Sequence, residues 1–147
     1  LDTGGGIFKG TEPFNENPFI VINPDTIWNN GYLDELNKLE KIFFKENKSS
    51  LLLVKKDNSF DTSFKGDFNL SDNLVSRDLE NEFIFTGAQI LNRKIFQSVN
   101  KKIFSMNAIW DILIQKRNLI GIESHQKFYH VNTKHTYDQI LKLKSID

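Results

Sequence analysis

The sequence predicts an α/β fold in which helices cover a mostly parallel sheet. Two short, wholly apolar runs, residues 19–22 and 51–54, have the composition of strands that are buried on both faces. Between them, residues 32–47 carry apolar side chains at spacings of three and four, which predicts an amphipathic helix. Its apolar positions are Leu33, Leu36, Leu39, Phe43 and Phe44. A strand, a helix and a strand within this length predict a βαβ unit with a right-handed crossover.

The elements on either side of this unit are predicted from local signals. Residues 7–11 begin a short helix, and residues 13–18 form a connector into the first strand. The polar stretch 55–81 contains a hairpin, in which residues 64–70 pair with 74–77 through the turn Ser71-Asp72-Asn73. Residues 83–91 then form a third core strand, with Thr86-Gly87 at its middle.

The C-terminal third is predicted to alternate helices and short strands. A short helix at 93–99 is followed by a helix at 106–115, for which Ser105 is the N-cap. Residues 119–124 and 127–131 are predicted as two paired strands. A closing helix begins at Thr133.

Composition describes an ordinary soluble protein of one domain. The chain has 147 residues, 26% of them charged and 39% apolar, and its nineteen basic and nineteen acidic residues cancel. This balance does not favour nucleic acid or an anionic membrane as a partner. The absence of cysteine excludes disulfides and thiolate metal sites, and no apolar run has the length of a membrane helix. We expect a cytoplasmic protein.

The first residues, Leu1-Asp2-Thr3-Gly4-Gly5-Gly6, are interpreted as a glycine-rich loop whose backbone approaches a ligand. Glycine loops of this kind normally follow a strand, and no strand precedes this one. The chain is therefore predicted to be a fragment that lacks the N-terminal strands of its domain. An exposed, flexible end is the alternative interpretation.

Asp25 is the strongest candidate for chemistry. It ends the turn Asn23-Pro24-Asp25 directly after the strand at 19–22, and ligands of open α/β sheets bind beyond the carboxyl ends of strands. The competing interpretation is that Asp25 only caps the turn. The three histidines, His125, His130 and His135, recur every five residues, a spacing that does not place them on one face of a helix or strand.

Five short motifs, taken in their order, carry a resemblance to a known family. They are Leu1-Asp2-Thr3-Gly4-Gly5-Gly6, Phe19 to Asp25, Lys65-Gly66-Asp67-Phe68, Phe85-Thr86-Gly87 and His130-Val131-Asn132-Thr133. Together they resemble the sugar-1-phosphate nucleotidyltransferases, and within them the N-acetylmuramate-1-phosphate uridylyltransferase branch. The resemblance spans nearly the whole chain, and residues 1–147 then correspond to the C-terminal two-thirds of a single nucleotidyltransferase domain. It implies a Rossmann-like sandwich with a mixed, mostly parallel central sheet that lacks its N-terminal strands.

The resemblance also implies roles for individual residues. Thr3, Gly4 and Gly5 would line the nucleoside pocket, and Asp25 would be catalytic by holding Mg²⁺ between the nucleotide and sugar phosphates. Gly66, Asp67, Thr86 and Gly87 would lie around the sugar. The substrates would be a nucleoside triphosphate, UTP first, and a sugar 1-phosphate.

Two departures from the family's pattern bear on activity. The leading Gly-x-Gly-x-Arg signature with its following lysine does not occur in these residues, so the fragment alone is expected to be inactive. Where many relatives carry Asp-Val-Gly-Thr, this chain has His130-Val131-Asn132-Thr133. Histidine is a poor Mg²⁺ ligand, so either Asn132 supplies an oxygen to the metal or Asp25 works with waters and phosphates.

Three alternatives to the uridylyltransferase remain. The first is a guanylyl- or thymidylyltransferase that uses mannose or glucose 1-phosphate. The second is a non-catalytic homologue that binds a nucleotide sugar. The third, a metal-dependent glycosyltransferase, predicts a second carboxylate two residues from Asp25; positions 23 and 27 are Asn and Ile, which speaks against this alternative.

Overall fold

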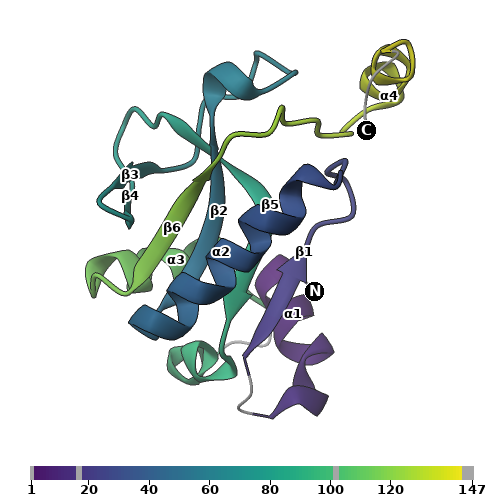
Figure 1. Ribbon diagram of the computed structural model, residues 1–147. Helices are drawn as coiled ribbons and strands as arrows, with labels where there is room; N and C mark the ends of the chain where they lie inside the picture. Colours follow the sequence, from purple (N-terminus) through teal and green to yellow (C-terminus); the bar gives the residue numbers. More distant parts are fainter. Residues whose placement is uncertain (1, 16–17, 101–102, 144–147) are drawn as a thin grey trace.

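A computed structural model describes residues 2–15, 18–100 and 103–143; Leu1 and part of the predicted connector 13–18 lie outside these ranges. In the described chain, six strands form one sheet in the order β1-β5-β2-β6-β4-β3 (Figure 1). The strands are β1 (Phe19–Ile22), β2 (Ser49–Lys55), β3 (Asn69–Ser71), β4 (Leu74–Ser76), β5 (Phe83–Leu91) and β6 (Leu119–Ser124). The helices are α1 (Thr3–Gly10), α2 (Gly31–Glu46), α3 (Met106–Gln115) and α4 (Lys134–Leu141), with 3-10 turns at Glu12–Phe14, Lys56–Asn58 and Arg93–Ser98.

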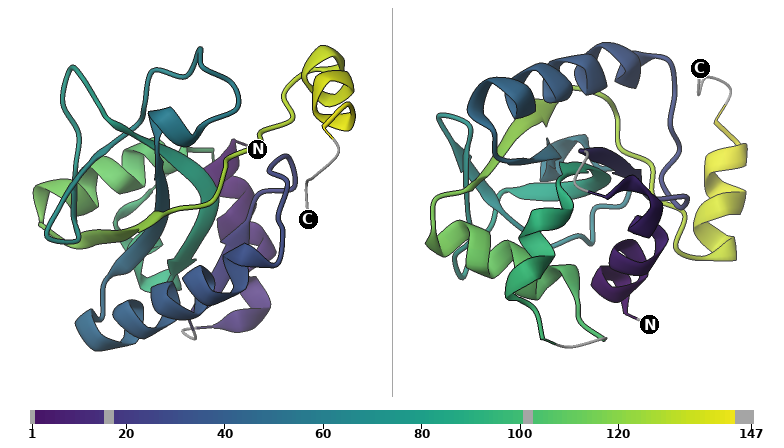
Figure 2. Two further views of the ribbon diagram at one scale, coloured as in Figure 1. Left: turned by 45° about the horizontal axis from the view of Figure 1, so that its top comes forward. Right: turned by 90° about the horizontal axis from the view of Figure 1, so that it is seen from below.

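Helices cover both faces of the sheet, as the α/β prediction requires. Figure 2 shows α2 on one face and α1 with α3 on the other. Two of the three apolar clusters in the described residues follow from the alternation of β2: Leu51 and Leu53 join the cluster on the α1 and α3 side, and Leu52 joins the cluster under α2. In the described residues, no helix combines the length and the apolar character that crossing a membrane requires.

The sheet is mixed, as predicted, but the prediction that it is mostly parallel is wrong. Within the described part of the chain only β2 and β6 pair in parallel. β5 pairs antiparallel with β1 on one side and with β2 on the other. β1 and β2 therefore run in the same direction, as the βαβ prediction requires, but β5 lies between them.

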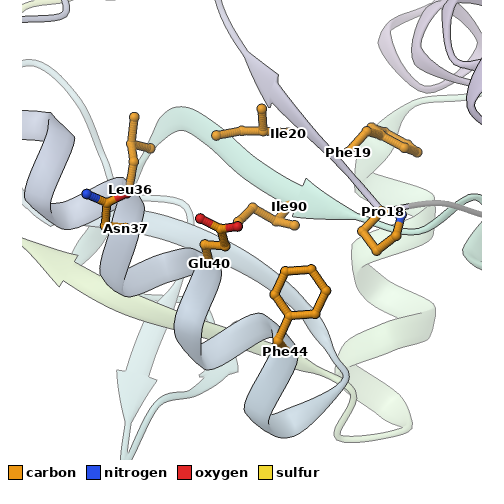
Figure 3. Close-up of a pocket in the computed structure, with 8 residues that line it drawn as sticks. All are labelled: Pro18, Phe19, Ile20, Leu36, Asn37, Glu40, Phe44 and Ile90. Carbon is orange, nitrogen blue, oxygen red and sulfur yellow. The ribbon is translucent and has the colours of Figure 1, made fainter.

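The strand at 19–22 is not buried on both faces, contrary to the prediction. Ile20 is 47% exposed and Ile22 is 43% exposed. Among the described residues β1 has a strand on one side only, and α2 packs on β2, β5 and β6. As a result, a groove of about 250 Å³ remains between β1 and α2 (Figure 3). Ile20 and Ile90 of the sheet face Leu36 and Phe44 of α2 across it.

Helix α2 occupies the predicted position, and three of its predicted apolar positions, Leu36, Leu39 and Phe43, pack in the core. Its buried residues are Tyr32, Glu35, Leu39 and Phe43. The other two predicted positions are more exposed: Leu33 is 60% exposed, and Phe44, which lines the groove, is 62% exposed. The buried face also includes a carboxylate, that of Glu35.

The C-terminal third is confirmed in its helices and corrected in one strand. The Ser105 side chain caps α3 by accepting from Asn107 N–H, and the Thr133 side chain caps α4 by accepting from Thr136 N–H. The predicted strand at 127–131 does not pair with β6. Phe128 and His130 instead form isolated bridges to Ser59 and Thr26, which lie beyond the ends of β2 and β1.

Candidate functional site

The segments that follow β1, β2 and β6 meet at one edge of the sheet, because these three strands run in the same direction. Val131 N–H donates to the Asp25 carbonyl over 2.7 Å, and Ile27 N–H donates to the Tyr129 carbonyl over 2.9 Å. The chain leaves the upper edge of the sheet after β1 and again after β6 (Figure 1). This is the edge where open α/β sheets bind ligands.

The side chains of Asp25 and His130 are in direct contact at this edge. Asp25 Oδ2 lies 3.1 Å from His130 Nε2, and the Asp25 side chain is 47% exposed. The His130 ring is held by Phe64 and Phe128, with ring centroids 5.6 Å and 6.1 Å away. Its Nδ1 is buried and has no hydrogen-bond partner among the described residues. The sequence placed both residues in motifs but did not predict that they touch.

Asp61 and Asn132 lie beside this pair. The side chain and backbone N–H of Ser63 hold the pKa of Asp61 below its usual range, with smaller contributions from Asn132 and His130. Asn132 Oδ1 accepts a hydrogen bond from Thr136 Oγ1 over 2.9 Å. The role of Asn132 as a metal ligand stays a prediction. Its side-chain oxygen already accepts the hydrogen bond from Thr136. The described part of the chain contains no group of three or more His, Cys, Asp or Glu side chains placed to share a metal ion.

Residues 3–6 form the first turn of α1, whereas the sequence indicated a loop. Asp2 caps the helix by accepting from Thr3 N–H over 2.7 Å, and Gly5 N–H donates to the Phe104 carbonyl. A Cβ on Gly4 would lie 2.5 Å from the Phe104 ring and 2.8 Å from the Phe104 carbonyl oxygen. Gly4 therefore allows α1 to pack closely against the segment that precedes α3.

Gly4→Ala is expected to lower the free energy of unfolding by about 1–3 kcal/mol, because the added methyl overlaps the Phe104 backbone. Gly6→Ala is the matched control. A Cβ at Gly6 meets nothing within 4 Å, and alanine is the better helix former, so this variant is expected to gain about 0.5–1 kcal/mol. Denaturant unfolding of both variants checks the pair, and equal effects would contradict the assigned packing role.

A small pocket of about 190 Å³ lies between α1, the end of β1, β5 and α3. Its lining combines hydroxyls, amides, aromatic rings and apolar side chains: Thr3, Ile7, Asn23, Phe85, Gln89, Ser105, Met106, Asn107 and Trp110. Trp110 Nε1–H donates to Gln89 Oε1 over 3.2 Å, which fixes the amide inside the pocket. Thr3 lines this pocket, whereas Gly4 and Gly5 are not among its lining residues, and the nucleoside-binding role of all three stays a prediction.

Asp67 and Thr86, two residues predicted to lie around the sugar, make different contacts near the edge of the sheet that carries Asp25. Asp67 is exposed and its Oδ2 accepts from Phe85 N–H over 2.8 Å, beside the pocket. Thr86 is buried: its hydroxyl donates to the Leu52 carbonyl, and its own carbonyl accepts from Thr26 Oγ1–H. Thr86 thereby holds Thr26, the residue next to Asp25, against β5.

Both predicted glycines of this region adopt positive φ. Gly87 has φ of 98°, and a Cβ there would lie 2.7 Å from the Asn23 Cβ, so the Asn23 side chain can pack directly on β5. Gly66 has φ of 82°, and a Cβ there would collide with the Asn81 carbonyl. Gly66 is required by the turn before Asp67.

Glu35 is a buried carboxylate that the sequence analysis did not identify as structurally important. Its carboxylate is buried and accepts from Ser124 Oγ–H over 2.6 Å and from His125 N–H over 2.9 Å. It thus ties α2 to the start of the segment that carries His130. Position 35 lies on the same face of the helix as the buried positions 32 and 39. A carboxylate at such a position indicates a buried, hydrogen-bonded side chain.

Solved structures share this fold. The chain superposes on the inositol-1-phosphate CTP transferase from T. maritima with a TM-score of 0.70 and 13% identity, covering 92% of this chain and 58% of that one. It superposes on a UTP-bound UGPase from Acinetobacter baumannii with a TM-score of 0.69 and 10% identity, covering 90% and 52%. For HddC from Yersinia pseudotuberculosis complexed with GMP-PN, the TM-score is 0.63 at 22% identity, covering 95% and 60%.

No protein-family model and no curated protein matches the sequence. The chain spans between half and two thirds of the length of the three structures above. At these identities the likeness concerns the fold. The chain therefore shares its α/β fold with these solved transferases.

Proposed function

We propose that this protein is a nucleotidyltransferase that condenses a nucleoside triphosphate with a sugar 1-phosphate and releases pyrophosphate. The observation that carries the proposal is the placement of Asp25, which lies half-exposed at the carboxyl edge of this fold, two residues beyond a pocket-lining asparagine. UTP and N-acetylmuramate 1-phosphate are the substrate pair we propose first, from the motif resemblance.

The pocket chemistry supports a sugar as one substrate. Amide groups from Asn23, Gln89 and Asn107 offer both donors and acceptors to hydroxyl groups, while Phe85 and Trp110 offer apolar ring surfaces. Asp67, held by the Phe85 backbone, adds an acceptor beside the pocket. We assign this pocket to the sugar and the region of Asp25 to the phosphates.

The reaction requires little covalent chemistry from the protein. A phosphate oxygen of the sugar 1-phosphate attacks the α-phosphorus of the nucleotide, and the bond from that phosphorus to the β-phosphate bridging oxygen breaks as pyrophosphate leaves. Both partners are anionic, so positioning and neutralisation of charge are the tasks left to the site.

The motif resemblance suggests Mg²⁺ as the neutralising cation, but the residues beside Asp25 fit Mg²⁺ poorly. Mg²⁺ prefers a shell of oxygen ligands, and Asp25 Oδ2 is in contact with an imidazole nitrogen. Mg²⁺ bound at that oxygen would leave His130 without a partner at Nε2, in addition to its unpartnered Nδ1. We therefore assign Asp25 to a divalent cation without assigning Mg²⁺, and derive no step through it.

The test is pyrophosphate release by the protein produced from its complete gene. We expect release with UTP and N-acetylmuramate 1-phosphate, in the presence of either Mg²⁺ or a transition-metal ion. Release only with GTP and mannose 1-phosphate, or only with a glucose 1-phosphate pair, would support the guanylyl- or thymidylyltransferase alternative. Binding of a nucleotide sugar without release from any pair would support the non-catalytic homologue.

A further inference from the structure

We propose that Arg77, which is not one of the residues that line the proposed sugar pocket, determines what that pocket selects. It holds the Asn107 amide so that the pocket presents hydrogen-bond donors. The pocket then favours a sugar 1-phosphate with an acylamino group over one with a hydroxyl group at the same carbon. The proposal rests on the proposed function, which assigns this pocket to the sugar, and adds a positioning residue that sets its preference.

Arg77 follows β4, and its guanidinium contacts two side chains of α3. Nη2 donates to Asn107 Oδ1 over 3.0 Å, and Nη1 donates to Asp111 Oδ1 over 3.0 Å. The guanidinium also lies over the ring of Phe68, 4.6 Å from its centroid, and Phe68 is fully buried. These three contacts fix the orientation of the guanidinium, and through it the orientation of the Asn107 amide.

Three polar side chains that line the pocket already use acceptor atoms within the protein. Asn107 Oδ1 accepts from Arg77, and Gln89 Oε1 accepts from Trp110 Nε1–H. Ser105 Oγ accepts from the backbone N–H of Asn107 over 3.2 Å and from its Nδ2 over 3.4 Å. These side chains therefore offer a ligand mainly amide N–H groups and the hydroxyl hydrogen of Ser105.

A carbonyl oxygen matches these donors better than a hydroxyl group does. The carbonyl oxygen accepts through two lone pairs, whereas a hydroxyl group also brings a hydrogen that needs an acceptor in the pocket. None of the described residues that line the pocket is charged, which favours a neutral carbonyl over a carboxylate. Phe85 and Trp110 offer apolar surface to the methyl group of an acetamido substituent, and Asp67, beside the pocket, can accept from its N–H.

Two sugar 1-phosphates that differ in one substituent test this preference. In EDTA, with UTP first absent and then present, we expect the protein produced from its complete gene to bind N-acetylglucosamine 1-phosphate at least about tenfold more tightly than glucose 1-phosphate. In NMR spectra the indole N–H signal of Trp110 should shift with the first sugar, because its hydrogen bond to Gln89 lies in the pocket. Equal affinities, binding of neither sugar, or no shift at Trp110 would overturn the proposal.

Arg77→Met tests the positioning role. Methionine keeps an unbranched side chain over Phe68 but removes both hydrogen bonds, so the Asn107 amide can turn and present its oxygen. The affinity ratio of the two sugars should then fall from about tenfold to within about twofold. Asp111→Ala is the matched control, because it removes the other partner of the guanidinium and keeps the bond to Asn107, so the ratio should remain. Thermal unfolding checks that both variants are folded, and an unchanged ratio in folded Arg77→Met would contradict the proposal.

Asn107→Asp gives a second test that does not depend on Arg77→Met being folded. The new carboxylate can still accept from Arg77 but offers a ligand no N–H group, so the affinity for N-acetylglucosamine 1-phosphate should fall at least about tenfold. Unchanged affinity would contradict the proposal. Pyrophosphate release is measured separately: release without a preference for the acylamino sugar rejects only this inference, whereas the preference without release from any substrate pair rejects the proposed transferase activity.

Discussion

For the proposed nucleotidyltransferase produced from its complete gene, Asp25→Asn is expected to reduce turnover at least about 100-fold while leaving the fold intact. The substitution keeps the size of the side chain but removes the negative charge that, in the proposed function, would hold a divalent cation, whose charge stabilisation is worth several kcal/mol. Asp25 is half-exposed and its carbonyl, which accepts from Val131 N–H, is unaffected, so the free energy of unfolding should change little. Pyrophosphate release and thermal unfolding measure the two effects.

Asp57→Asn is the matched control for this experiment. Asp57 is an exposed carboxylate in the 3-10 turn that directly follows β2, at the same edge of the sheet. Its loss lowers the local negative charge by the same amount, and turnover should stay within a few-fold of the starting protein. Comparable losses in both variants would attribute the effect to general electrostatics instead of to Asp25.

Glu35→Ala is expected to lower the free energy of unfolding by about 2–4 kcal/mol, the largest stability effect predicted for this protein. The substitution leaves the Ser124 hydroxyl and the His125 N–H without their acceptor and opens space beneath α2. Alanine favours helices, so a lower helix propensity cannot account for the loss. Denaturant unfolding monitored by circular dichroism gives the magnitude.

Glu40→Ala on the same helix provides the comparison. Glu40 is exposed beside the groove between β1 and α2, and its replacement should alter stability by no more than about 0.5 kcal/mol. If Glu35→Ala were as mild as this control, the buried carboxylate would not hold the segment after β6 in place.

Local patterns were sufficient to predict most elements of the fold. The apolar run at 51–54 is fully buried, and the predicted strand at 83–91 coincides with β5. Ser105 and Thr133 are confirmed as the N-caps of α3 and α4. They could be predicted because their hydrogen bonds involve residues only two or three positions away. Each of these signals depends on neighbours in the sequence.

What the sequence did not predict depends on residues distant in the chain. β5 separates β1 from β2 because of pairings such as Ile20 with Ile90, which no local pattern encodes. The contact of Asp25 with His130 likewise needs the segments after β1 and β6 to come together. The packing of Gly4 against Phe104 joins positions far apart in the sequence, so the glycine-rich motif by itself does not reveal it.

The position of β5 also constrains how the chain folds. Residues 19–22 and 49–55 leave the ribosome before residues 83–91, yet β5 supplies the pairing surface for both. β1 cannot pair with β5, its neighbour in the described sheet, until β5 has been synthesised. α2 can form earlier because its hydrogen bonds are local. Non-local pairing of this kind slows folding, so β1 is expected to be among the last parts of the sheet to gain hydrogen-exchange protection.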